Sequence, residues 1–204
     1  GPNSRVTITP AQNKSVTLEG NGRNVLFFMN TSYVTLDGVE LTGATTLTVH
    51  SSTNTQFDIN NAVGVYENSD YNNFKNLIVS VEDYLRSSRG IFITGGTNPQ
   101  SVPDNNLIMH NFIKKAGVAI LVDKTTSNII KANDIGSETD SLISWGIQSQ
   151  RSLNTLIEEN HVQNLRFGIF YECPGIDSYL DNGCIIRNNV VHNIDGKNAR
   201  DGGF

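Results

Sequence analysis

The sequence is poor in the features that mark nucleic-acid-binding or membrane-spanning proteins. Charged residues are only 17 % of its 204 residues, the net charge is −5, and the Lys and Arg residues are scattered. Because a phosphate backbone is bound by clustered cations, nucleic acid is not an expected partner. No apolar run approaches the roughly 18 residues of a membrane span, so no span is expected.

Cysteine is nearly absent. The only two, Cys173 and Cys184, are separated by ten residues that include Pro174 and Gly175. A disulfide between them would suit an exported protein, whereas two thiols packed as small apolar residues would not require export. The sequence leaves both alternatives open.

Asparagine, in contrast, is abundant, with 26 Asn and 18 Gly in the chain. This composition favours turns and strands over helices. One phrase also recurs: an apolar residue, two spacers, Asn, one spacer and a second apolar residue. Its full copies are Ile108-x-x-Asn111-x-Ile113, Ile130-x-x-Asn133-x-Ile135, Ile157-x-x-Asn160-x-Val162 and Ile186-x-x-Asn189-x-Val191. Asp37 takes the Asn place in Val34-x-x-Asp37-x-Val39, and Asn76 begins a partial copy.

A second phrase, Gly followed by alternating apolar residues, falls between these copies. It begins at Gly64, Gly90, Gly117, Gly146 and Gly168. Both phrases are too short for helices, and they predict the successive short strands of stacked coils of about 22 residues. Loop insertions are expected at residues 94–106 and 173–183, and one more coil should pass through residues 57–59.

Stacking of coils explains why like residues recur. Equivalent residues of adjacent coils lie about 4.8 Å apart, the spacing of hydrogen-bonded strands. Buried Ile and Val would then form apolar columns, and the Asn side chains would bond neighbouring backbone and one another in a ladder. We interpret the repeated Asn residues as structural rather than catalytic.

These phrases resemble the repeats of right-handed parallel β-helix proteins of the pectin-lyase-like superfamily, over roughly residues 15–204. The resemblance implies an all-β fold, a right-handed single-stranded parallel β-helix with loop insertions. It implies little about chemistry, because this superfamily includes polysaccharide lyases, glycoside hydrolases, esterases, tailspikes and adhesins. The sequence lacks the characteristic motifs of the polygalacturonase-like hydrolases, pectin methylesterases and major pectate lyases of this superfamily. Among the enzymes of this fold, the class that remains is a lyase whose active site is less tied to a fixed sequence motif.

Alternation along the Gly strands predicts which residues face solvent. With Ile91, Val118, Ile147 and Ile169 inside, the outward residues are Phe92, Ala119, Gln148 and Phe170, and Tyr66 is expected to join them. Exposed rings on one face suit the apolar faces of sugars. We therefore predict a substrate-binding row of Tyr66, Phe92, Gln148 and Phe170; the alternative is that the 94–106 loop covers the rings.

The turns after these strands hold a mixed-charge cluster. Asp123, Arg151 and Glu172 come from consecutive coils, so they could lie close together. In lyases that this fold resembles, Lys or Arg neutralises a uronate carboxylate and removes the neighbouring proton, which makes Lys124 and Arg151 the catalytic candidates. Asp123 and Glu172 are candidate Ca²⁺ ligands. The alternative is an ordinary solvated rim.

The histidines give no comparable signal. His110, His161 and His192 flank the repeated Asn at offsets of −1, +1 and +3. Different offsets place them in different columns, so a shared metal site is not expected.

The two ends suggest a larger protein. Gly1 and Pro2 resemble the remnant of a cleaved purification tag, and residues 201–204 look like the start of another Gly strand. We expect residues 1–20 to hold the tag remnant and an N-terminal strand or cap, and residues 21–204 to form the β-helix. Further coils, other domains or self-association would cover the open end.

Together these features predict a secreted or cell-surface domain that binds polysaccharide along one outer face, and that is a lyase if it is an enzyme. The alternative is a non-catalytic structural or adhesive solenoid that contacts protein.

Overall fold

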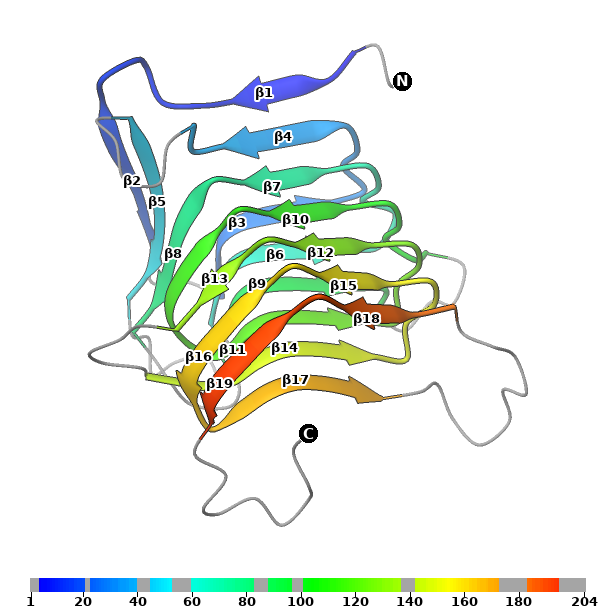
Figure 1. Cartoon of the computed structure of the whole chain (residues 1–204). Coiled ribbons are helices and arrows are strands. Elements are labelled where there is room, and N and C mark those ends of the chain that lie inside the picture. Colours follow the sequence, from blue (N-terminus) through cyan, green and yellow to red (C-terminus); the bar gives the residue numbers. More distant parts are fainter. Residues whose placement is uncertain are drawn as a thin grey trace.

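The structure of the chain is a computed structural model. It describes residues 4–20, 23–39, 45–52, 60–82, 88–96, 101–136, 142–172 and 183–194. The described residues form nineteen strands and no helix, and all paired strands run parallel. None of the described segments is a helix able to cross a membrane. Figure 1 shows the strands stacked in columns, with the chain passing from one column to the next in each coil.

The strands form three columns. The first is a seven-stranded sheet of β1 (Val6–Ile8), β4 (Val34–Asp37), β7 (Asn73–Lys75), β10 (Leu107–Met109), β12 (Ile129–Lys131), β15 (Leu156–Glu158) and β18 (Ile185–Arg187). The second holds β2 (Ser15–Gly20), β5 (Thr46–Ser51), β8 (Leu77–Val81), β11 (Phe112–Asp123), β13 (Asp134–Ile135), β16 (His161–Leu165) and β19 (Val190–Ile194). The third holds β3 (Asn24–Met29), β6 (Asn61–Tyr66), β9 (Arg89–Thr94), the second half of β11, β14 (Leu142–Gln150) and β17 (Phe167–Glu172). This confirms the predicted all-β parallel solenoid.

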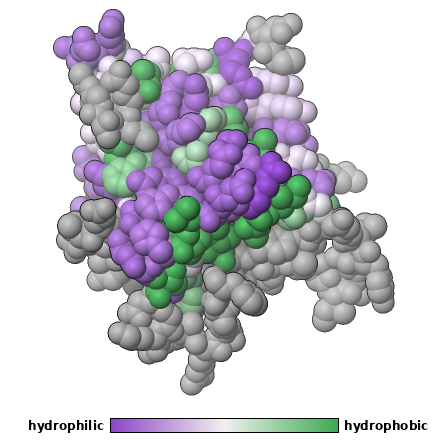
Figure 2. Space-filling view, viewed as in Figure 1, coloured by the Kyte–Doolittle hydropathy of each residue, from purple (hydrophilic) through white to green (hydrophobic). Residues whose placement is uncertain are grey.

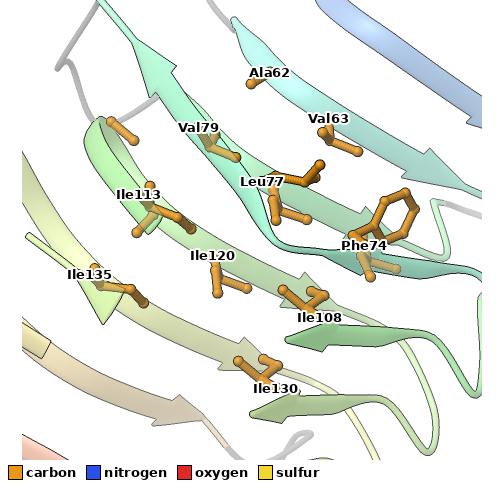
Figure 3. Close-up of a cluster of buried hydrophobic side chains, with 14 of the residues drawn as sticks. Ala62, Val63, Phe74, Leu77, Val79, Ile108, Ile113, Ile120, Ile130 and Ile135 are labelled. Carbon is orange, nitrogen blue, oxygen red and sulfur yellow. The ribbon is translucent and has the colours of Figure 1, made fainter. Parts of the chain in front are cut away.

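The interior consists of the expected apolar columns. In the first column, Phe74, Ile108, Ile130 and Ile157 follow one another in register and are almost fully buried. Figure 3 shows the first three of these side chains beside Val79, Ile113 and Ile120 from the other columns. Burial of each such side chain contributes about 2 kcal/mol, so the apolar columns together stabilise the fold strongly.

The Asn ladder predicted for the turn after the first column is present. Asn133 Oδ1 accepts hydrogen bonds from Asn111 N and Nδ2, at 3.0 and 2.9 Å. Asn133 in turn donates from N and Nδ2 to Asn160 Oδ1, and Asn160 repeats the pattern with Asn189. The Asn residues of the repeat are therefore structural, as interpreted from the sequence.

In the first coils, the residues at the ladder position are not the ones predicted from the sequence. Asp37 pairs in register with Lys75, two positions before the ladder. Asn76 precedes the ladder position by one residue, because Leu77 N donates to Asn111 Oδ1. Asn76 instead has the positive φ, 57°, that His110 also adopts in the next coil. Asn tolerates this left-handed conformation, which explains why an Asn stands one residue before the ladder position and resembles the repeated Asn there.

A second ladder, which the sequence analysis missed, lies at the turn before the first column. Asn72 N donates to Asn106 Oδ1, and Asn106 N donates to Asn128 Oδ1, both at 2.9 Å. In the last two coils Thr155 N donates to Cys184 Sγ at 3.3 Å. The signal was an Asn two residues before the first Ile of the repeated phrase. Cys173 and the loop that holds it lie outside the described residues.

The Gly strand of the fourth coil is also shifted from its expected register. Ile120, not Val118, pairs with Ile91 and Ile147, so Ala119 takes the Gly position and Leu121 takes the outward one. A Cβ at Gly90 would lie 2.5 Å from Ala119 O, so the position needs a very small residue. Aligning the coils on Gly117 therefore gave the wrong register, because Ala serves in its place.

Other insertions and end segments are only partly described. Three further segments lie outside the described residues: residues 97–100 of the 94–106 insertion, the predicted coil segment 57–59 and residues 195–204. At the N-terminal end, β1 and β2 pair with β4 and β5, so they extend the first and second columns.

The ladder gives a direct stability test. Asn133→Ala should lower the free energy of unfolding by about 3 kcal/mol, because it leaves buried groups of Asn111 and Ile108 without partners. Asn68→Ala is the matched control, since Asn68 is exposed and its side-chain amide donates to Asn30 Oδ1 at the surface. Urea denaturation followed by circular dichroism measures both; equal stability of the two variants would contradict the structural role.

Candidate functional site

The outer face of the third column carries most of the predicted binding residues. Strand register places Phe92, Leu121, Gln148 and Phe170 in one row across four coils. Tyr66 pairs with Thr94, two positions further along the strand. The structure therefore brings Tyr66, Phe92 and Gln148 to one face. The side chains of Phe170 and Glu172 lie outside what it describes.

Three rings form a continuous aromatic row, defined here as Phe27, Tyr66 and Phe92. The ring centroids of Phe27 and Tyr66 are 5.2 Å apart, and those of Tyr66 and Phe92 are 5.7 Å apart in an edge contact. Gly64 makes this possible: a Cβ there would lie 2.7 Å from the Tyr66 ring. The Tyr66 ring thus lies over Gly64, which occupies the outward position between Phe27 and Phe92.

Polar groups fix the aromatic row from beneath and beside it. The Tyr66 hydroxyl donates to Asn24 Oδ1 at 3.1 Å, and Asn61 Nδ2 donates to the same oxygen at 2.9 Å. The Arg89 guanidinium lies 4.3 Å from the centre of the Phe92 ring, a cation–π contact. Burial raises the pKa of the Tyr66 hydroxyl and lowers the pKa of Arg89.

The aromatic row is accessible, whereas the middle of the same face is not. Phe27 is 57 % exposed, and Tyr66 and Phe92 are partly exposed. Val118, Leu121 and Gln148 are only 3 %, 5 % and 7 % exposed. The aromatic row is therefore the accessible part of this face, and Gln148 is less available to a ligand than Tyr66 and Phe92.

Sequence reasoning missed several residues of this face. Arg89, Trp145 and Phe167 each stand directly before the small residue that opens a Gly strand, and Trp145 stacks on Phe167 with centroids 4.0 Å apart. Their shared position before a small residue was the sequence signal that could have identified them. In the strand register, Val118 occupies the same position. Phe27 could be found only through its register with Gly64, which has no side chain.

The mixed-charge cluster lies at the turn edge of the same column. Arg151 binds Asp123 with two parallel hydrogen bonds, Nε to Oδ1 at 2.8 Å and Nη2 to Oδ2 at 2.6 Å. Lys124 Nζ donates to Gly96 O at 3.0 Å. Asp123 and Arg151 largely neutralise each other, so Ca²⁺ at Asp123 would have to displace Arg151. The described residues contain no group of three or more His, Cys, Asp or Glu side chains placed for a metal.

The outer face of the first column is occupied by ion pairs. Lys75 binds Asp37 at 2.8 Å, and Glu158 binds both Lys131 and Arg187 at 2.9 and 2.8 Å. Hydrogen bonds from Lys131 and Arg187 hold the pKa of Glu158 below its ordinary value. These charges already have partners within the chain, which leaves the third column as the better candidate for a ligand.

The histidines depart from expectation. His161 and His192 meet on the outer face of the second column, with their Nε2 atoms 2.8 Å apart, and Asp134 contacts the other nitrogen of His161. The expectation that they would stay apart was wrong, because diagonal neighbours on adjacent parallel strands can bring long side chains into contact.

Gly64 provides a test of the aromatic row. Gly64→Ala should displace both Asn24 and the Tyr66 ring, because the new Cβ would overlap Asn24 Oδ1 and lie 2.7 Å from the ring. Exposure of the hydroxyl should change the near-ultraviolet circular dichroism and move the raised pKa of Tyr66 back toward its ordinary value, since burial is the largest influence on that pKa. Gly20→Ala is the control, because its new Cβ would come no closer than 3.4 Å to Val25. Alkaline titration of tyrosine absorbance, with Tyr66→Phe to identify the signal, measures the effect; unchanged spectra in Gly64→Ala would refute the packing.

Comparison with known families agrees with this architecture. The family model described as right handed beta helix region matches residues 37–203. No curated protein matches the chain.

Proposed function

Because the chain belongs to the right-handed β-helix family, whose fold serves many functions, we propose a function from the site itself: the protein binds a polysaccharide along the outer face of its third column. The observation that carries the proposal is the aromatic row of Phe27, Tyr66 and Phe92. Its rings are adjacent, partly exposed and fixed by neighbouring polar groups.

The aromatic row has the mixed character that sugar recognition requires. A sugar presents apolar C–H faces and polar hydroxyl edges, so it suits rings with hydrogen-bonding groups beside them. The Tyr66 hydroxyl donates to Asn24 Oδ1 and accepts from Asn61 Nδ2, which holds the ring in one orientation. A fixed ring loses little conformational freedom when a ligand binds.

The charges near the row favour an acidic polymer. Arg89 lies over Phe92, and Lys124 lies at the turn edge that follows the next strand. Arg23 is close enough to Tyr66 to influence its hydroxyl electrostatically. A uronate or sulfated sugar would bring anionic groups to these cations, which a neutral sugar would not. Polymers of this kind are met outside cells, which supports a secreted or cell-surface location.

Binding is tested by retention on immobilised polysaccharides. Phe27→Ala and Phe92→Ala should each weaken retention on an acidic polymer about tenfold, since one aromatic contact contributes on the order of 1 kcal/mol. Phe112→Ala is the matched control, because this ring lies on the second column, beside Lys114. If no polymer retains the wild type, the structural or adhesive alternative is favoured.

A second candidate activity is polysaccharide β-elimination, favoured by the position of Lys124 and Arg151 at the turn edge of the binding face. Elimination needs a cation beside the uronate carboxylate and a base for the neighbouring proton. Arg151 would exchange Asp123 for the carboxylate of the substrate, and Lys124 would accept the proton from the carbon next to that carboxylate. The electron pair of the broken C–H bond would form the C4–C5 double bond, the C4–O glycosidic bond would break, and the leaving oxygen would take a proton from water. Ca²⁺ could serve in place of Arg151 if Asp123 and Glu172 were free to bind it.

Elimination is tested by the ultraviolet absorbance of unsaturated products from pectin, alginate and glycosaminoglycans, with and without Ca²⁺. If the reaction occurs, Lys124→Asn should reduce its rate about 10²-fold or more, because a general base contributes at least that factor. Asn tolerates the positive φ, 53°, of this position. Glu67→Asn, at the corresponding turn of an earlier coil, is the control. Absence of product from every polymer would remove the lyase candidate and leave binding intact.

Exposed apolar residues on the last coil favour a further contact, in which another segment or molecule covers this end of the solenoid. Ile186 and Val191 pair in register with the buried Ile157 and Val162, yet they are exposed, as are Ile185 and Val190. Figure 2 shows hydrophobic surface in a band over β18 and β19. Further coils or domains of a larger protein, or a second copy, would bury this band and pair the outer edges of β18 and β19, which no other described strand pairs.

A further inference from the structure

Two histidines from different coils meet on the outer face of the second column, on strands separate from those that carry the aromatic row. His161 begins β16, and His192 lies in the neighbouring strand β19. His161 pairs in register with Val190 and His192 with Gln163, so the two histidines are diagonal neighbours. Their ring centroids are 5.0 Å apart and their Nε2 atoms 2.8 Å apart.

Asp134 orients one member of this pair. It pairs with His161 in the strand register, and its Oδ1 lies 3.1 Å from His161 Nδ1. A carboxylate accepts, so this contact places the proton of a neutral His161 on Nδ1 and leaves the lone pair on Nε2. The same carboxylate–histidine arrangement supports the ligands of many protein metal sites.

We propose that His161 and His192 bind one divalent transition-metal ion through their Nε2 atoms, with Asp134 as the positioning residue. Two nitrogens bound at about 2.0–2.1 Å and at right angles lie about 2.9 Å apart, close to the separation of these atoms. Two ligands of a tetrahedral ion would lie about 3.3 Å apart. The geometry therefore suits Cu²⁺ or Ni²⁺, which prefer right-angle coordination, better than Zn²⁺.

The remaining coordination positions would be filled from outside. Among the described residues no third His, Cys, Asp or Glu side chain is placed to bind with this pair. The His161 side chain is 41 % exposed and that of Asp134 47 %, so an ion and its water ligands can reach the pair. Two nitrogens 2.8 Å apart share one proton when no ion is present. When an ion binds, His192 gives up this Nε2 proton and carries a proton on Nδ1 instead.

The test is calorimetric titration of the full chain with Cu²⁺, Ni²⁺ and Zn²⁺ in a buffer that does not bind metals. One ion should bind, with Cu²⁺ the tightest. His161→Ala and His192→Ala should each weaken binding about tenfold or more, and Asp134→Asn about 10- to 100-fold, the usual effect of losing an orienting carboxylate. The electron paramagnetic resonance spectrum of bound Cu²⁺ should show two imidazole nitrogens, and one in either His variant.

His110→Asn is the matched control, because His110 is exposed at a turn and Asn tolerates its positive φ of 54°. Circular dichroism of each variant confirms that the fold is retained. Equal binding by the wild type and the double His161→Ala/His192→Ala variant would overturn the proposal, as would the absence of binding by all three ions. The pair would then be a hydrogen-bonded contact only. Neither result depends on whether the third column binds sugar.

Discussion

Parallel hydrogen bonding between coils is the constraint on which the rest of this structure depends. Each strand bonds to the equivalent strand of the next coil, so residues of one register position meet at the spacing of a β-sheet. Side chains at one register position therefore stack on their counterparts in the coils before and after. The buried column of Phe74, Ile108, Ile130 and Ile157 and the ladder of Asn111, Asn133 and Asn160 follow from that single repeat.

The same constraint explains the unusual backbone at the turns. His110, Ala132 and Glu159 occupy equivalent turn positions and all have φ between 51° and 59°. This left-handed conformation costs a residue with a Cβ roughly 1–2 kcal/mol. In each case the amide of the strained residue donates to a carbonyl of the next coil, as His110 N does to Lys131 O at 3.2 Å. Stacking of coil on coil thus holds a conformation that these residues would not adopt alone.

Stacking also limits where ligands can bind. Inward positions are filled by the core and the buried side chains of the turns by the ladders. This leaves the outward positions of three columns and the outer turn edge that carries Lys124 and Arg151. On the first column these positions carry ion pairs, on the second they bring together His161 and His192, and on the third they carry the aromatic row. Each outer face therefore has its own chemistry on a common scaffold, which is why the fold alone does not identify the function.

The sequence by itself determined the architecture, because its repeated phrases directly encode strands that can stack only on copies of themselves. It also indicated which face carries Phe92 and Tyr66. Register and diagonal contacts were decided by the tertiary structure, because Ala119 can replace a Gly and Leu77 can replace an Asn without ending the stack. The packing of Tyr66 over Gly64 and the meeting of His161 with His192 depend on the separation of atoms across coils, which the intervals between sequence positions do not give.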